Sequence, residues 1–313
     1  MNYIGNIIRE YRDMQGMSRK ELAENICSEK YVYLIENGTR TPSAEVSRSF
    51  GEKLGVDLFK YYEYLDCIDP IQVEATISLF YKYRSENNMD DLLKETDLAM
   101  QLPDFQRKPW IYEIEHNKIA YKVLKEGKCL EAIDEIQNIL KKAERKYKES
   151  ICFAGYYVLL STCYQMIRDL DQAKAGVQKA MELIANKENI SKDNYIVIAV
   201  KINKITLHFA QGEYDDVIRE GFALNQYQIK TSSYELGHHG LFYLAYAHYQ
   251  KGLEEEGIEW FLKALYASLI RTKPSDIFYL TQHKIFNIMI SDGRVPRDLA
   301  GQFMHKYNIV VHS

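Results

Sequence analysis

The sequence predicts an all-α protein with a small N-terminal helical domain followed by a long array of helix pairs. Apolar residues recur every three or four positions through almost the whole chain, and the alternating runs typical of strands are absent. After residue 66, turn positions recur at intervals of 39 to 44 residues, which indicates a repeat. The length of 313 residues is too great for one small module and leaves room for both parts.

Composition and charge exclude several classes of protein. Hydrophobic residues make up 46% and charged residues 27%, which is typical of a chain that folds around a core. The net charge of −4 gives no overall basic surface. No apolar run reaches the ~20 residues of a membrane helix, and Arg9 and Glu10 within the first periodic segment argue against a signal peptide. The five cysteines are scattered and never spaced as C-x-x-C, so we expect reduced thiols and a cytoplasmic protein.

Capping residues predict five short helices in the first 66 residues. The first helix carries apolar residues from Ile4 to Tyr11 and ends near Gly16. Ser18 begins the second, and Glu21 three residues later completes a capping box.

The next three helices of this domain follow the same logic. Ser28 caps a third helix that stops at Gly38, where glycine adopts the left-handed conformation. Ser43 caps a fourth helix that ends at Gly55, and residues 56–64 begin a fifth.

The second and third helices are predicted to form a helix-turn-helix. Residues 17–28 and 35–43 resemble the phage-repressor type of this module. The connection between the two helices is one residue shorter than the commonest form and contains no glycine. The Glu-Asn-Ile-Cys-Ser string at residues 24–28 is similar to that of the Rgg, PlcR and PrgX regulators of Gram-positive bacteria.

We expect the third helix to read DNA from the major groove. Lys30 can donate to guanine acceptors, and Glu29 can accept from the cytosine amino group. The side chains predicted to contact bases or phosphates are Ser18, Arg19, Ser28, Glu29, Lys30, Tyr33 and Arg40. Residues 1–65 hold nine basic and ten acidic side chains, so non-specific binding should be weak and operator affinity should depend on two copies acting together. A helical adaptor that has lost DNA binding is the alternative.

The second part of the chain, residues 67–313, is predicted to be a repeat array, with Asp69-Pro70 marking the boundary. The aligned turn positions are Asn88, Gly127, Arg168, Gly212, Gly252 and Gly293. Small or apolar residues recur five and twelve positions after the turns and eight before them, with Lys204 as the exception. The units resemble tetratricopeptide repeats, which implies a right-handed superhelix whose concave face is lined by the first helix of each pair. An irregular helical bundle is the alternative.

A concave helical groove is suited to an extended peptide or a partner helix. Asparagine amides both donate and accept hydrogen bonds and can therefore pair with a peptide backbone, while lysines could meet a carboxylate. The side chains predicted to bind peptide are Lys82, Asn117, Tyr121, Gln165, Lys201, Asn203, Tyr243, Tyr246, His283 and Asn287. The 25 tyrosines cannot all bind a ligand, and most are expected to fill spaces between helices.

Motifs for catalysis are absent from the sequence. There is no Walker loop, dinucleotide-binding glycine pattern, HExxH or GxSxG. His238-His239 forms the one histidine cluster, without ligands at suitable spacing to complete a metal site. We therefore expect no enzyme activity, no cofactor and no metal.

The resemblance to the Rgg, PlcR and PrgX group implies a function. It implies a cytoplasmic transcription factor that is a homodimer or a higher oligomer. Such a factor binds a palindromic operator and is switched by a short signalling peptide held in the repeats. Two alternatives remain open. One is a repeat-based protein-interaction adaptor, and the other is a ligand-independent repressor, phage- or plasmid-borne, whose repeats serve only to dimerise.

Overall fold

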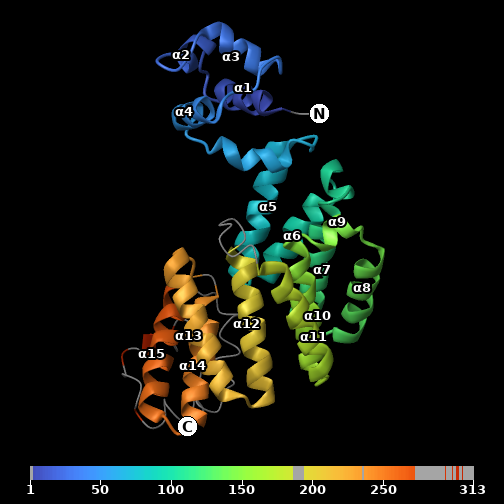
Figure 1. Ribbon diagram of the computed structural model, residues 1–313, viewed down its shortest axis with the longest axis vertical. Coiled ribbons are helices and arrows are strands. Elements are labelled where there is room, and N and C mark those ends of the chain that lie inside the picture. The colour runs from blue at the N-terminus through green and yellow to red at the C-terminus, as the bar shows by residue number, and fades with distance from the viewer. Residues whose placement is uncertain are drawn as a thin grey trace. The chain divides into compact units, whose positions relative to one another are not determined.

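The protein is helical, as the sequence predicts. The computed structural model describes residues 3–185, 194–234 and 236–271, together with residues 293, 298, 301, 302 and 305. Every regular element within these residues is a helix (Figure 1). The chain forms two compact units: unit 1 is Met1–Phe80 with Asp97–Ile111, and unit 2 is Tyr81–Thr96 with Tyr112–Ser313.

Unit 1 contains the predicted short helices with their predicted caps. Ser18 Oγ accepts a hydrogen bond from the Glu21 amide at 3.2 Å, and the Glu21 side chain completes the capping box. Ser28 caps the third helix in the same way. The fourth helix ends at Gly55, with φ of 65°. The fifth element is a 3₁₀ helix rather than an α-helix. The bounds are α1 Ile4–Met14, α2 Arg19–Ala23, α3 Glu29–Glu36, α4 Ala44–Leu54, η1 Leu58–Tyr64 and η2 Pro103–Gln106.

One apolar core holds these helices together, and α1 meets α3 at very close range. A Cβ atom on Gly5 would lie 1.9 Å from the carbonyl oxygen of Ile35. Only a residue without a side chain permits this approach. The buried core residues are Ile4, Ile7, Ile8, Leu22, Ala23, Val32, Ile35, Phe50, Leu54, Leu58 and Tyr61.

Unit 1 extends beyond the boundary expected at residue 66, because residues 97–111 return to it. The carboxylate of Asp104 accepts hydrogen bonds from the amides of Ile68 and Asp69 at 2.9 to 3.0 Å. Trp110 Nε1 donates to Cys67 Sγ at 3.1 Å. These contacts join segments far apart in the sequence, which spacing alone does not reveal.

Unit 2 is built from consecutive helix pairs. In Figure 1, α12, α13, α14 and α15 lie side by side, each in contact with the next. The first helix α12 also contacts α10 and α14, the first helices of its neighbouring pairs, which is how tetratricopeptide repeats stack. Helices α5 and α6 cross between the units, since residues 70–80 of α5 and 97–99 of α6 belong to unit 1. The bounds of the helices after η1 are α5 Pro70–Ser85, α6 Met89–Ala99, α7 Ile111–Leu124, α8 Cys129–Lys142, α9 Arg145–Lys148, α10 Cys152–Met166, α11 Leu170–Ile184, α12 Asn194–Gln211, α13 Tyr214–Thr231, α14 Gly237–Gln250 and α15 Glu254–Arg271.

The predicted turn register is confirmed at five of the six positions. A left-handed residue ends the first helix at Gly127, Arg168, Gly212 and Gly252, and Gly293 is also left-handed. In the first pair the left-handed residue is Asn87, one position before the predicted Asn88. The buried residues five and twelve positions later are accordingly Leu92 and Ala99, which are 0% and 1% exposed, rather than Leu93 and Met100.

Small residues lie where helices cross, as expected. Gly176 of α11 faces Ser161 of α10, and a Cβ on it would lie 3.1 Å from the serine side chain. Lys204, the exception in the pattern, extends from α12 to form an ion pair of 2.9 Å with Glu220 of α13. Among the described helices, none has both the length and the apolar character needed to cross a bilayer.

Candidate nucleic-acid interface and repeat face

The turn between α2 and α3 places the third helix on the outside of unit 1. Asn25 takes the left-handed conformation with φ of 61°. Asparagine tolerates this conformation better than most residues, which explains how a turn without glycine is made. Leu22 on α2 and Val32 on α3 are fully buried beneath it.

The predicted DNA-contact residues lie on the opposite face of α3 from its buried residues. Val32 and Ile35 are 0% exposed, whereas Glu29, Lys30 and Tyr33 are exposed to solvent. Ser18, Ser28 and Arg40 are exposed as well. The two serine side chains also cap α2 and α3. The helix can therefore present acceptor, donor and aromatic groups to a partner without unfolding.

Arg19 differs from the expectation of a free phosphate contact. Its Nε lies 2.6 Å from a carboxylate oxygen of Glu36, and its guanidinium lies 5.3 Å from the ring centroid of Tyr33. The side chain is 38% exposed. Arg19 is thus held against α3, and the arrangement orients Tyr33 as well as offering positive charge.

Beneath Arg19 lies a buried ion pair that sequence reasoning missed. Glu36 is 1% exposed, and its carboxylate accepts from Arg12 Nε at 2.6 Å and from Arg12 Nη2 at 3.2 Å. Arg12 also donates to the carbonyl of Met17. The hydrogen bond with Glu36 raises the pKa of Arg12. The pair fixes α1, the start of α2 and the end of α3 relative to one another.

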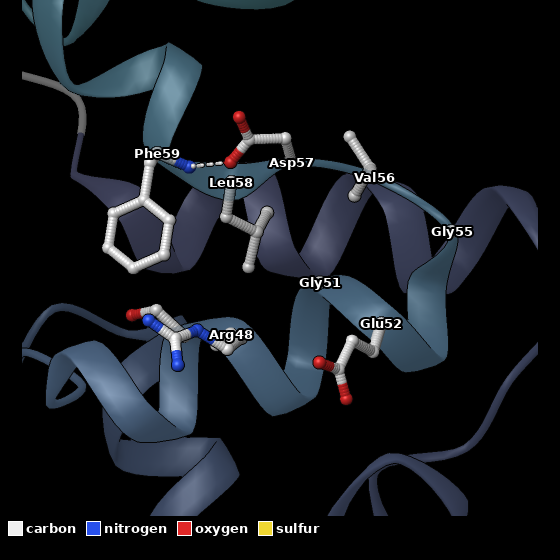
Figure 2. A pocket seen from close by; sticks show the side chains of 9 residues that line it. Arg48, Gly51, Glu52, Gly55, Val56, Asp57, Leu58 and Phe59 are labelled. Atoms are coloured by element: carbon white, nitrogen blue, oxygen red, sulfur yellow. Dashed lines mark hydrogen bonds between the residues drawn. The ribbon is translucent and has the colours of Figure 1, made fainter.

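An open hollow lies between α4 and η1. Figure 2 shows Leu58 pointing into it, with Phe59 on one side and Arg48 on the other. Asp57 accepts a hydrogen bond from the Phe59 amide at 2.9 Å and so caps η1. None of the predicted DNA-contact residues lines this hollow.

Comparison with known proteins identifies unit 1. A helix-turn-helix family model matches residues 8–60. The regulator YqaF of Bacillus subtilis is 39% identical over 57 residues, which are 75% of its length. The chain belongs to the helix-turn-helix transcriptional regulators. A Methanococcus maripaludis protein described as an HTH-type regulator of transcription is 38% identical over 77 residues, and the match spans 24% of each chain.

Solved structures show that the fold of most of the chain is shared. Bacillus thuringiensis PlcR, in a complex with the peptide PapR7 and DNA, is 16% identical with a TM-score of 0.62 over 86% of this chain and 95% of PlcR. ComR from S. thermophilus, in a complex with DNA and its signalling peptide ComS, is 17% identical with a TM-score of 0.54 over 93% of this chain and 98% of ComR. The predicted resemblance is therefore confirmed for the fold.

Asn203 is the predicted peptide-contact residue with an unused hydrogen-bonding atom. Its Nδ2 donates to Thr162 Oγ1 of α10 at 3.1 Å. Its Oδ1 is buried and accepts no hydrogen bond from the described residues. Gln165 donates to Ser161 Oγ at 3.2 Å beside it. The structure thus brings Asn203 and Gln165 together at the contact between α10 and α12.

Asn117 does not fit the predicted role. It is 0% exposed, its Oδ1 accepts from Arg84 Nε at 2.8 Å, and its Nδ2 donates to Thr96 Oγ1 at 3.0 Å. Arg84 is itself buried and paired with Glu113 at 2.7 Å. The amide oxygen therefore accepts a hydrogen bond from a buried arginine, and Asn117 is not available to a peptide.

The other predicted peptide-contact residues are spread over several helices. Tyr243 and Tyr246 of α14 pack against Phe209 of α12, with centroid distances of 5.1 and 4.7 Å. Lys201 lies 5.1 Å from the ring centroid of Tyr227. Lys82 is exposed on α5, and Tyr121 is half-buried on α7. His283 and Asn287 lie outside the described residues.

Three side chains that could bind a metal ion lie close together, but they are already bonded to other side chains. His208, Glu213 and Asp216 place ligand atoms within 4.8 Å of one another at the turn between α12 and α13. However, His208 Nδ1 is bonded to Glu213 at 2.6 Å, and Asp216 is paired with Arg219 at 2.5 Å. These groups satisfy one another within the protein. His238 is buried, and burial with the neighbouring His239 lowers its pKa, so it is not a surface ligand.

Proposed function

We propose that the protein is a cytoplasmic, non-catalytic transcription factor that binds operator DNA through α3 and is switched by a short peptide held by unit 2. The observation that carries the proposal is the fold shared along most of both chains with PlcR, which was solved with peptide and DNA. The α3 face with Glu29, Lys30 and Tyr33 exposed supports the DNA role.

Operator recognition is expected to require two copies. The first 65 residues carry nearly balanced charge, so phosphate attraction alone gives little affinity. Two recognition helices spaced one helical turn apart, ~34 Å, would read a palindromic site. We therefore propose a homodimer, or a higher oligomer built from dimers, as the DNA-binding form.

DNA binding is tested with an operator selected from a random duplex library and measured by fluorescence anisotropy. Lys30→Ala should weaken binding by roughly 10- to 100-fold, because one base contact is worth about 1–3 kcal/mol. Lys174→Ala removes an exposed lysine of α11 and is the matched control. No selected sequence, or equal losses for both variants, would contradict the assignment of α3.

Peptide binding is proposed to use Asn203 and Gln165. An amide pair at a helix contact can bond an extended backbone regardless of its side chains, and Asn203 Oδ1 still has a free acceptor position. The peptide changes operator occupancy only through unequal affinity for two arrangements of the dimer.

The peptide role is tested with synthetic peptides encoded by short reading frames beside the gene. Asn203→Ala should abolish peptide binding and leave peptide-free operator affinity unchanged, while the exposed Asn138 of α8 provides the control Asn138→Ala. If operator affinity is identical with and without every peptide that binds, the switch is wrong, and the repeats serve only to assemble the protein.

A further inference from the structure

Three sulfur atoms meet where α8 contacts α10. Cys129 is the first residue of α8, and Cys163 and Met166 lie three residues apart on α10. Cys129 Sγ donates to Met166 Sδ at 3.5 Å, and the Cys163 thiol lies close enough to the Cys129 thiol to interact with it. Two thiols and a thioether from two helices therefore converge on one point.

The three sulfur-bearing side chains differ in their exposure to solvent. Cys163 is 0% exposed and Cys129 is 5% exposed, whereas Met166 is 54% exposed. A methionine that only filled the core would be covered, since apolar packing is gained by burial. Here the thioether directs its sulfur at a buried thiol while the rest of the side chain meets solvent. One of the three sulfur-bearing side chains is therefore accessible from solvent.

The surroundings suit a thiolate in the presence of a cation. Cys129 stands at the N-terminus of a 14-residue helix, where the helix dipole favours negative charge.

We propose that Cys129, Cys163 and Met166 form a binding site for monovalent copper. Thiolate and thioether sulfurs are soft donors that select Cu(I). Structural zinc instead takes four nitrogen, sulfur or oxygen ligands in a tetrahedron. On binding, the two thiols release two protons, and copper gains two thiolate ligands and one thioether without any change of oxidation state.

This inference is independent of the proposed peptide switch. The metal would join the second helix of one pair to the first helix of the next, a contact otherwise made by packing. A bound cation that favours the folded state also raises its stability. The array would then be stiffened at α8 and α10 when copper is present.

The test uses the full-length reduced protein under anaerobic conditions, titrated with Cu(I) held by the chelator bicinchoninic acid. We expect the protein to withdraw one equivalent of copper. Cys129→Ser and Cys163→Ser should each lower the affinity by more than ~100-fold, since even outer partners of a metal site change affinity ~10- to 100-fold. Met166→Leu should lower it by roughly tenfold. Cys27→Ser, a half-buried thiol of unit 1, is the matched control and should bind as the wild type does.

Because Cys163 is fully buried, circular dichroism checks the fold of each variant, and exposed Met166 supplies a substitution that leaves the core intact. X-ray absorption of the loaded protein should show sulfur ligands alone. The proposal is overturned if copper stays with the chelator, if the control and the three site variants bind equally, or if nitrogen and oxygen ligands are found. A disulfide between Cys129 and Cys163 with copper left unbound would also overturn it.

Discussion

Replacing Glu36 with glutamine should destabilise unit 1 strongly while leaving its shape unchanged. The carboxylate accepts three hydrogen bonds at 2.6 to 3.2 Å, two from Arg12 and one from Arg19. Arg12 is 8% exposed and cannot turn to water. Removing one partner of a buried ion pair costs about 3–5 kcal/mol. Arg12 keeps its bond to the Met17 carbonyl and its ion pair with Asp13 at 2.6 Å, so we expect the lower end, about 3 kcal/mol.

The loss can be read from one tryptophan. The chain has two tryptophans, and Trp110 stacks on Tyr64 within unit 1 at 5.2 Å. In a Trp260→Phe background, Trp110 fluorescence reports urea unfolding of unit 1 in the full chain. With a slope of about 2 kcal/mol per molar urea, a 3 kcal/mol loss lowers the midpoint by about 1.5 M.

Two comparisons make this prediction refutable. Glu52→Gln changes an exposed carboxylate of the same unit and should stay within about 0.5 kcal/mol. Arg12→Met combined with Glu36→Leu removes both charges and should recover most of the stability, since apolar replacements of a buried pair are often neutral. A loss below about 1 kcal/mol for Glu36→Gln, or a double variant no better than the single, would refute the argument.

Three further outcomes test the packing and the titration of buried groups. Gly5→Ala should lower the stability of unit 1 in urea unfolding by about 3 kcal/mol or more, because the new Cβ would lie 1.9 Å from the Ile35 carbonyl oxygen. Gly16→Ala is strained only by the φ of 65° at that position and should cost about 1 kcal/mol. Equal losses for the two variants would contradict the close contact. Burial, and then the charge of Arg84, lower the pKa of His116 to about 3, so the folded state excludes a proton that the unfolded chain binds below pH 6.5. Thermal unfolding followed by circular dichroism should show a loss of about 2 kcal/mol from pH 6.5 to 5 that is absent in His116→Gln. Burial opposes ionisation of Asp104, but hydrogen bonds from the Asp69 and Ile68 amides outweigh burial and lower the pKa of Asp104 below 3.8. The ionised carboxylate therefore stabilises the fold fully above pH 3.8, and this contribution is lost as the pH falls through the lowered pKa. Asp104→Asn should be less stable than the wild type at pH 7, and the difference should shrink as the pH falls below 3.8. A difference that stays constant in acid would refute this.

Local signals in the sequence were sufficient for the secondary structure of unit 1. The caps Ser18, Ser28 and Ser43 each accept from an amide three residues away, so their chemistry is visible in a short window. Turn glycines are equally local, and they fixed the repeat register except at Asn87, where two adjacent asparagines made the choice ambiguous.

Long-range pairing is what the sequence could not supply. Asn117 was predicted to be available for peptide because asparagine is a versatile ligand, yet Arg84 from another helix occupies its oxygen. Arg19 was predicted to contact DNA, but the sequence did not reveal that Glu36, 17 residues further along, also binds it. In both cases an unpaired buried charge would be costly. Each of the two side chains therefore has a partner within the protein.

The return of residues 97–111 to unit 1 has a practical consequence. The helix-turn-helix segment cannot be cut out as a piece ending near residue 66 without losing Asp104 and Trp110, which bind residues 67–69 in the intact chain. Fragments ending near residue 66 lack these contacts, so their C-terminal residues should be more sensitive to proteases than the same residues in the intact chain. Exchanging helix-turn-helix segments between relatives by a single crossover near residue 66 would likewise separate partners that stabilise each other, so chimeras need both segments of unit 1 from one parent.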